Sequence, residues 1–230
     1  MTETQHHSRF YFNMGLLLLG LVVLGFGSTA FMRGTSPFEL PLLFHVHGVS
    51  YVLWFCLFIF QANLIGSDNH ALHKKVGLLS LIVVPMMIVT AFLMSGVSYD
   101  RGISPVPELG IKQFLALPMG DLVGLILFFT IAILNRHIPL THKHAMLVMS
   151  IAIMDQALTR FGVVLGFPPL GLLLHFVLIG LVIFHDRKAH QKVHWVTWLG
   201  LAYLIWRPIF VLFVASGDGW ANLMDMFFAK

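Results

Sequence analysis

Seven long stretches of apolar residues alternate along the chain with short polar connections. Their approximate bounds are 13–32, 41–65, 74–96, 114–135, 143–165, 168–185 and 193–215. A helix rises 1.5 Å per residue, so about 20 residues are needed to cross ~30 Å of hydrocarbon, and each stretch is close to that length. The pattern therefore predicts an all-α protein, a bundle of seven transmembrane helices in a single domain comprising residues 1–230.

The composition supports a membrane protein. Hydrophobic residues make up 58% of the chain, charged residues only 10%, and the mean hydropathy is +0.86, outside the range of ordinary soluble domains. We expect the lipid bilayer as partner and no nucleic acid, because most basic residues lie in the short connections. The single cysteine, Cys56, excludes an intrachain disulfide. The first apolar stretch lacks a cleavage site after it, so we interpret it as a retained helix.

The basic residues divide unequally between the two ends of the predicted helices. One end collects Arg9, Lys74, Lys75, Arg136, Lys143, Arg187, Lys188 and Lys192, and the other has Arg33, Arg101, Lys112 and Lys230. Because cytoplasmic connections are enriched in Lys and Arg, the pattern predicts a cytoplasmic N-terminus and an outside C-terminus. Two further segments stand out: residues 97–113 are a predicted surface loop, and residues 217–230 a predicted short interfacial helix.

Ionisable residues lie inside the apolar stretches, where hydrocarbon penalises charge. They are Asp121, Asp155, Arg160, His175 and Arg207, with His45 and His47 just inside another stretch. Counting helical rise inward from the outer ends places all of them at a similar depth of roughly 6–16 Å. Five different helices contribute, so the groups converge only if those helices surround one cavity. Such residues mark a functional site or a structural pairing, and we predict a polar chamber that opens outward.

Two interpretations of the four charges stay open. Asp121 paired with Arg160, and Asp155 paired with Arg207, would neutralise each other and join three helices without performing any chemistry. Alternatively, the same four residues are candidate catalytic residues, with a carboxylate as ligand or proton acceptor and the arginines anchoring an anionic group. The pairing interpretation leaves the histidines of this layer without a carboxylate partner.

His45, His47 and His175 are therefore the candidate metal ligands. Three imidazoles with a carboxylate nearby suit zinc, iron or copper, and axial histidines suit a b-type haem. His47 shares one helical face with Ser50, Tyr51, Trp54, Phe58 and Gln61, which favours it over His45. The leading hypothesis is a membrane metalloenzyme or oxidoreductase acting on a small or lipid-soluble substrate. The alternatives are a proton-coupled carrier that uses the same layer, and a structural membrane subunit.

A second set of histidines gathers at the predicted cytoplasmic ends. It comprises His70, His73, His137, His142, His144, His185, His190 and His194. The pairs 70/73 and 190/194 have the spacing of metal ligands on one helical face. The full set of paired histidines of a membrane di-iron enzyme is missing, so we interpret these residues as topological and interfacial.

Short motifs resemble those of a group of bacterial integral membrane proteins without an assigned activity. They are Phe44-His45-Val46-His47-Gly48, His73-Lys74-Lys75-Val76-Gly77, Thr141-His142-Lys143-His144-Ala145-Met146 and Thr159-Arg160. In that group a histidine begins one helix in a His-x-x-x-Gly context, and another histidine begins a helix that ends in an arginine. The resemblance implies a helical bundle in the bacterial inner membrane and carries no substrate.

Overall fold

The computed structural model describes residues 3–33, 41–102, 104, 106, 109–167 and 169–229, without the side chains of residues 3–7 and 30–33. These residues form helices and no strand, so the all-α prediction is confirmed. The elements are α1 (Glu3–Arg33), α2 (Leu42–Gly66), α3 (His70–Gly77), α4 (Ser80–Arg101), α5 (Ile111–Phe114), α6 (Ala116–Leu134), α7 (Pro139–Ala152), α8 (Asp155–Val164), α9 (Leu170–His190), α10 (Trp195–Ile209), the π-helical turn η2 (Phe210–Val214) and α11 (Asp218–Phe228).

Six helical segments in the described part of the chain are long and apolar enough to cross a membrane. The seventh predicted span, 143–165, forms two helices, α7 and α8, which are bent by 41° at residues 153–154. The number of spans is therefore six, or seven if the bent pair is one span. The break sets Asp155 in the first turn of α8, where the helix dipole favours a carboxylate.

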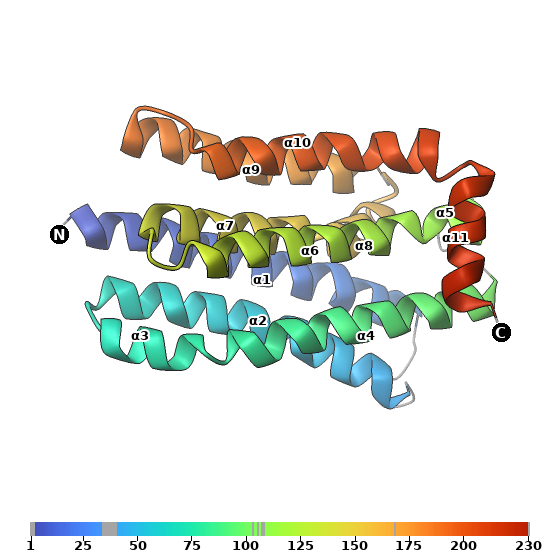
Figure 1. The fold of residues 1–230 in the computed structure, drawn as a ribbon, viewed down its shortest axis with the longest axis horizontal. Coiled ribbons are helices and arrows are strands. Elements are labelled where there is room, and N and C mark those ends of the chain that lie inside the picture. Colours follow the sequence, from blue (N-terminus) through green and yellow to red (C-terminus); the bar gives the residue numbers. More distant parts are fainter. Residues whose placement is uncertain are drawn as a thin grey trace.

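The long helices run side by side, and α7 and α8 occupy the interior of the bundle (Figure 1). These two helices pack against α1, α6, α9 and α10. The core is apolar and tightly filled, with side chains such as Leu18, Phe55, Met87 and Phe128 that are 0–1% exposed. The broken span is thus covered on several sides, and its polar side chains depend on neighbouring helices for partners.

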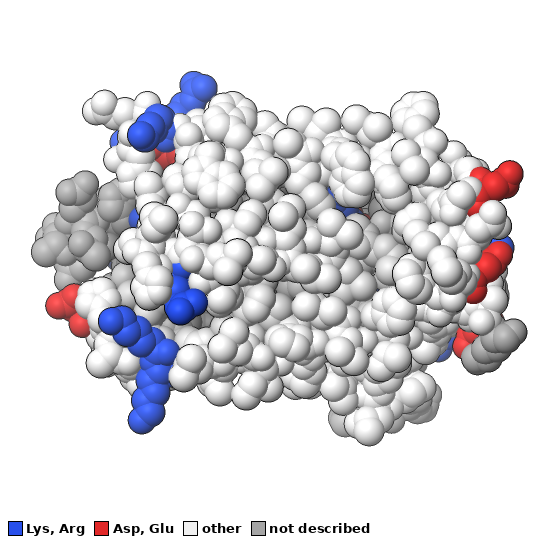
Figure 2. Space-filling view, in the orientation of Figure 1, with Lys and Arg blue, Asp and Glu red and all other residues white. Residues whose placement is uncertain are grey.

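Charged side chains concentrate at the two ends of the molecule and leave a broad uncharged surface between them (Figure 2). Lys and Arg gather at the end that holds the N-terminus and the α9–α10 connection, which we call the inner end after the predicted cytoplasmic side; the opposite end, with α11, is called the outer end. The orientation itself stays a prediction. Large apolar side chains in the middle are exposed, including Val89, Phe184 and Phe213. This surface is compatible with contact to lipid. Two of the basic residues counted above are not covered: the structure does not describe the side chain of Arg33 or any part of Lys230.

The predicted C-terminal helix forms as α11 and crosses the outer end of the bundle (Figure 1). It is held by Asp225, which accepts hydrogen bonds from Tyr99 and Lys112 at 2.6 Å each. Both hydrogen bonds lower the pKa of Asp225, and the bond from Lys112 has the larger effect. The Trp220 indole also donates to the Lys112 carbonyl. The predicted loop 97–113 is shorter than expected, because α4 continues to Arg101 and α5 begins at Ile111.

Candidate functional site

Three charged side chains from three helices meet near the outer end, and we call Asp121, Asp155 and Arg207 the outer ion cluster. The Nη2 atom of Arg207, on α10, lies 2.8 Å from Oδ1 of Asp121 on α6. The same Nη2 lies 3.4 Å from Oδ2 of Asp155 on α8, and it donates to the Leu117 carbonyl at 3.2 Å. One guanidinium nitrogen thus serves two carboxylates and a backbone oxygen.

Two glycines of α6 create the space for this cluster. A Cβ atom on Gly124 would lie only 2.6 Å from the Tyr203 hydroxyl oxygen, and one on Gly120 would lie 3.1 Å from Nε of Arg207. The Tyr203 hydroxyl donates to the Gly120 carbonyl. Tyr203 and Arg207 are four residues apart on α10, and Gly120 and Gly124 have the same spacing on α6. The two large side chains of α10 therefore fit opposite the two small residues of α6.

The outer ion cluster is incompletely satisfied. Asp121 and Arg207 are each only 6% exposed. Among the described residues, neither Oδ1 of Asp121 nor Nε of Arg207 has a hydrogen-bond partner of normal geometry. Counted as charges, the cluster holds one cation against two carboxylates. A buried group that lacks its partners carries a large free-energy cost, so this imbalance requires an explanation.

Of the two expected pairs, Asp155 with Arg207 forms, but Asp121 also pairs with Arg207 and not with Arg160. Arg160 donates to the backbone and side-chain oxygens of Gln156, and its guanidinium lies 4.5 Å above the ring of Phe26 on α1. The reason is geometric. Asp155 and Arg160 are five residues apart, about 140° around α8, so they face different neighbouring helices.

The candidate histidines lie in separate surroundings. His175, on α9, is 1% exposed, lies 3.1 Å from the Gly171 carbonyl through Nδ1, and is within electrostatic range of Asp155 and Arg207. His47, on α2, lies 3.3 Å from the Thr90 hydroxyl of α4. His45 lies one turn into α2 and is partly buried. The inward face predicted for α2 is confirmed by its buried residues, which include Ser50, Trp54 and Phe58.

The predicted ligands do not form a ready metal site. Within the described ranges, no three His, Cys, Asp or Glu side chains are arranged to hold a metal ion. His47 contacts α4, whereas His175 is held by its own helix, α9, which packs on α8. A metal or haem bound by His45, His47 and His175 stays a prediction.

A second buried group lies near the inner end, and we call His144, Asp186, His194 and Thr197 the inner histidine cluster. Nε2 of His144 lies 2.6 Å from Oδ1 of Asp186, and both side chains are fully buried. Oδ2 of Asp186 accepts hydrogen bonds from the His194 backbone N–H at 3.0 Å and the Thr197 hydroxyl at 2.8 Å. Both carboxylate oxygens therefore have partners.

Hydrogen bonds fix the orientation of the His144 ring. Its Nδ1 lies 2.7 Å from the Leu140 carbonyl, which can only accept, so Nδ1 carries hydrogen and Nε2 faces Asp186. The ring of His194 stacks on it with centroids 4.5 Å apart, and the Tyr11 hydroxyl lies 3.3 Å from Nδ1. Burial, and then the neighbouring His144, lower the pKa of His194 to about 4.

The interfacial interpretation is wrong for His144, which is 0% exposed, and sequence reasoning missed its partner Asp186. Asp186 lies in the run His185-Asp186-Arg187-Lys188, which resembles a solvated helix end. The available signal was an acid within an otherwise basic turn. His70 fits the interfacial interpretation better, because it pairs with Asp68 at 2.9 Å on the exposed surface.

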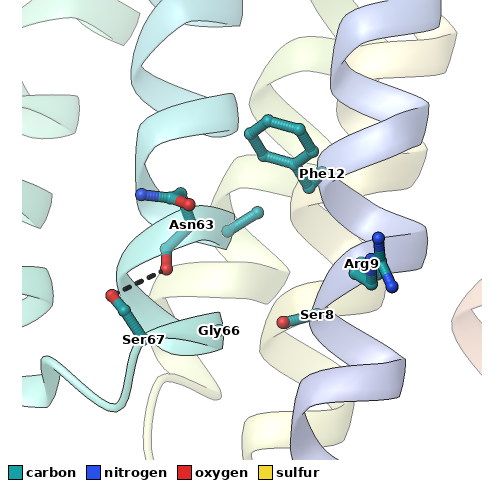
Figure 3. Close-up of a pocket in the computed structure, with 7 residues that line it drawn as sticks. Ser8, Arg9, Phe12, Asn63, Gly66 and Ser67 are labelled. Carbon is teal, nitrogen blue, oxygen red and sulfur yellow. Dashed lines mark hydrogen bonds between the residues drawn. The ribbon is translucent and has the colours of Figure 1, made fainter. Parts of the chain in front are cut away.

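A hollow of about 400 Å³ lies between α1 and α2 at the inner end (Figure 3). Its lining consists of Ser8, Arg9, Phe12, Ala62, Asn63, Gly66 and Ser67. The Ser67 hydroxyl is used locally, because it donates to the Asn63 carbonyl at 3.0 Å (Figure 3). None of the lining residues belongs to the inner histidine cluster or to the outer ion cluster. The outer ion cluster, which is buried and incompletely satisfied, is the stronger candidate site.

Comparison of the chain with protein-family models, with curated proteins and with solved structures found no match. The resemblance to bacterial inner-membrane proteins therefore stays a prediction, and the function has to be argued from the geometry.

Proposed function

We propose that this membrane protein is a proton-coupled carrier whose proton-binding centre is the outer ion cluster. The observation that carries the proposal is the burial of one guanidinium, Arg207, between two carboxylates, Asp121 and Asp155. In hydrocarbon such groups are costly, and they commonly mark proton relays and ion paths in pumps and transporters.

Charge neutrality gives the cluster its proton. With both acids ionised, Asp121, Asp155 and Arg207 sum to one negative charge, which a low-dielectric interior strongly disfavours. One bound proton makes the sum zero. That proton resides on a carboxyl group or on the nearby His175, whose electrostatic partners include Asp155 and Arg207. The site therefore binds one proton at rest.

Irregular helices at the cluster support a carrier. Asp155 follows the break between α7 and α8, and Arg207 precedes Pro208 and the π-helical turn η2. Interrupted helices at membrane depth are typical of secondary transporters, where they surround the binding site and accommodate its movement. π-Helical turns are also frequent at functional sites.

Infrared titration of the purified protein tests the proton. We expect the wild type at neutral pH to show the band of a protonated carboxyl group, lost in Asp121→Asn or Asp155→Asn, or a protonated imidazole lost in His175→Gln. Asp68→Asn, at an exposed acid, is the control and should leave the spectrum unchanged. Two ionised carboxylates with a neutral His175 would overturn the proposal and favour a structural role.

Proteoliposomes test the coupling. A carrier moves its proton only together with a solute, so vesicles containing the wild-type protein and a pH-sensitive dye should remain proton-tight under an imposed potential. If the wild type instead conducts protons rapidly without a solute, and Arg207→Gln or Asp155→Asn alters that conduction, the protein is not a carrier. The visible spectrum and metal content of the same preparation test the predicted haem or metal, with His47→Ala and His175→Ala as the variants that should lose it.

A further inference from the structure

An apolar groove of about 350 Å³ runs along the seam between α6 and α10. It is lined by Val123, Leu127, Leu199, Ala202, Tyr203 and Trp206. Val123 and Trp206 are 50% and 41% exposed, and none of the six lining residues is charged. In a membrane this groove opens to the hydrocarbon, so a ligand that reaches it comes from the lipid phase.

The groove shares one residue, Tyr203, with the surroundings of the outer ion cluster. Tyr203 lies in its wall, and the guanidinium of Arg207 lies 5.8 Å from the Tyr203 ring. Gly120, beside Arg207, shares the α6 face with Val123 and Leu127 at helical spacing. Blue Lys or Arg atoms are visible in a hollow of the otherwise white middle surface, where α6 and α10 adjoin (Figure 2). Tyr203 thus belongs both to the apolar wall and to the surroundings of Arg207.

Arg207 has an unused donor at this place. Its side chain is 6% exposed, and its Nε–H has no hydrogen-bond partner among the described residues. Gly120 presents no side chain to Nε, and a Cβ built there would lie only 3.1 Å from it. A guanidinium prefers a carboxylate that engages two of its N–H groups, and here one nitrogen already attracts two carboxylates.

We propose that the substrate of the carrier is a lipid-soluble carboxylate, with its apolar body in the α6–α10 groove and its head on Arg207. This inference rests on the proposed function, because it names the solute that accompanies the proton. A neutral acyl chain of a bilayer lipid would fill the groove but leave Nε without a partner, whereas a carboxylate head can accept a hydrogen bond from it.

Charge balance then sets the stoichiometry. The resting site holds Arg207 and two carboxyl groups with one proton between them and is neutral. A carboxylate that displaces the aspartates from Arg207 adds one negative charge, and a second proton on the cluster restores neutrality. Each substrate anion thus enters with one proton, and the loaded site also carries no net charge.

Quenching of Trp206 fluorescence tests the site, because Trp206 lines the groove. The probe is a long-chain fatty acid with bromine on its chain, added to the protein in nanodiscs, and Trp206→Phe identifies the signal. We expect saturable quenching by the acid. The methyl ester of the same brominated acid, which lacks the anionic head, should bind at least about tenfold more weakly, the loss of one charge-assisted hydrogen bond.

Two variants make the result specific. Ala202→Phe fills the groove without altering the ion cluster and should weaken binding of the acid by about tenfold or more. Val177→Phe, at an exposed position on α9, is the matched control and should not change binding of the acid. Equal binding of acid and ester, or binding insensitive to Ala202→Phe, would overturn the inference and indicate ordinary bilayer lipid. If infrared spectra still show the proton bound to the outer ion cluster in that case, the carrier proposal stands and only its substrate class fails.

Discussion

The two buried polar clusters contain similar groups but differ in how well their hydrogen bonds are satisfied. At the inner end Asp186 has a partner for each oxygen, from His144, the His194 backbone and Thr197. At the outer end a single nitrogen of Arg207 attracts two carboxylates, while Nε of Arg207 and Oδ1 of Asp121 lack hydrogen bonds among the described residues. A saturated network rigidifies a fold, whereas an unsaturated one can exchange partners.

The clusters also share their scaffold. Asp186 and His175 are eleven residues apart on α9, about 16 Å along the axis, and α10 supplies Thr197 to one cluster and Arg207 to the other. Buried apolar residues such as Leu178 and Ile179 lie between them. We infer that the inner histidine cluster fixes the packing of α7, α9 and α10, so that the outer cluster can change its protonation without disturbing the bundle.

The largest effect is expected from Asp186→Asn. The amide keeps the shape but removes the negative charge opposite His144, and breaking a buried ion pair costs about 3–5 kcal/mol. Thermal unfolding in detergent should show a large loss of stability. Asp68→Asn, which alters an exposed His–Asp pair at the same end, is the control and should change stability by less than about 0.5 kcal/mol. Equal effects of the two variants would contradict a structural role for the inner cluster.

A smaller and pH-dependent effect is expected from Arg207→Gln. Without the cation, Asp121 and Asp155 can still become neutral by binding protons, so we expect a loss of about 2 kcal/mol at neutral pH. The loss should shrink as the pH falls, since protons then replace the guanidinium. Unfolding curves of wild type and variant across a pH series measure this. A deficit independent of pH would show that the two clusters behave alike.

Gly124→Ala should disturb the outer cluster by crowding. The new methyl would meet the Tyr203 hydroxyl at 2.6 Å, and overpacking of this kind costs about 1–3 kcal/mol. Tyr203 would have to leave the Gly120 carbonyl, so the infrared signal of the cluster should shift as well. Gly180→Ala, where a Cβ meets nothing within 4 Å, is the matched control. If both alanines are neutral, close packing of α6 on α10 is not needed.

The smallest effect concerns pH and the inner cluster. His194 has a pKa lowered from 6.5 to about 4, so the folded state binds fewer protons than the unfolded state in that window. Its contribution to stability is complete above about pH 6.5 and is lost as the pH falls towards 4. His194→Asn retains a cap for α10 without a titrating ring and should flatten this part of the stability curve. An unchanged slope would exclude His194 as its source.

Much of the fold follows from the sequence because hydrophobic length is a local property. The apolar stretches identified the helices and their approximate number, and period 3.6 identified the buried face of α2 with Ser50, Trp54 and Phe58. The break at residues 153–154 carries no proline or glycine and was not predicted. The common depth of Asp121, Asp155 and Arg207 was predicted from helical rise, and the three side chains do meet.

The sequence by itself determined the class of the protein, because the cost of exposing backbone and charge to hydrocarbon depends on composition and length alone. Only the tertiary structure decided which partners the buried charges take. Arg207 rather than Arg160 reaches Asp121, and Asp186 is buried against His144, because helix rotation and the glycines of α6 determine which side chains face each other. Such pairings join residues up to 86 positions apart, and no local pattern records them.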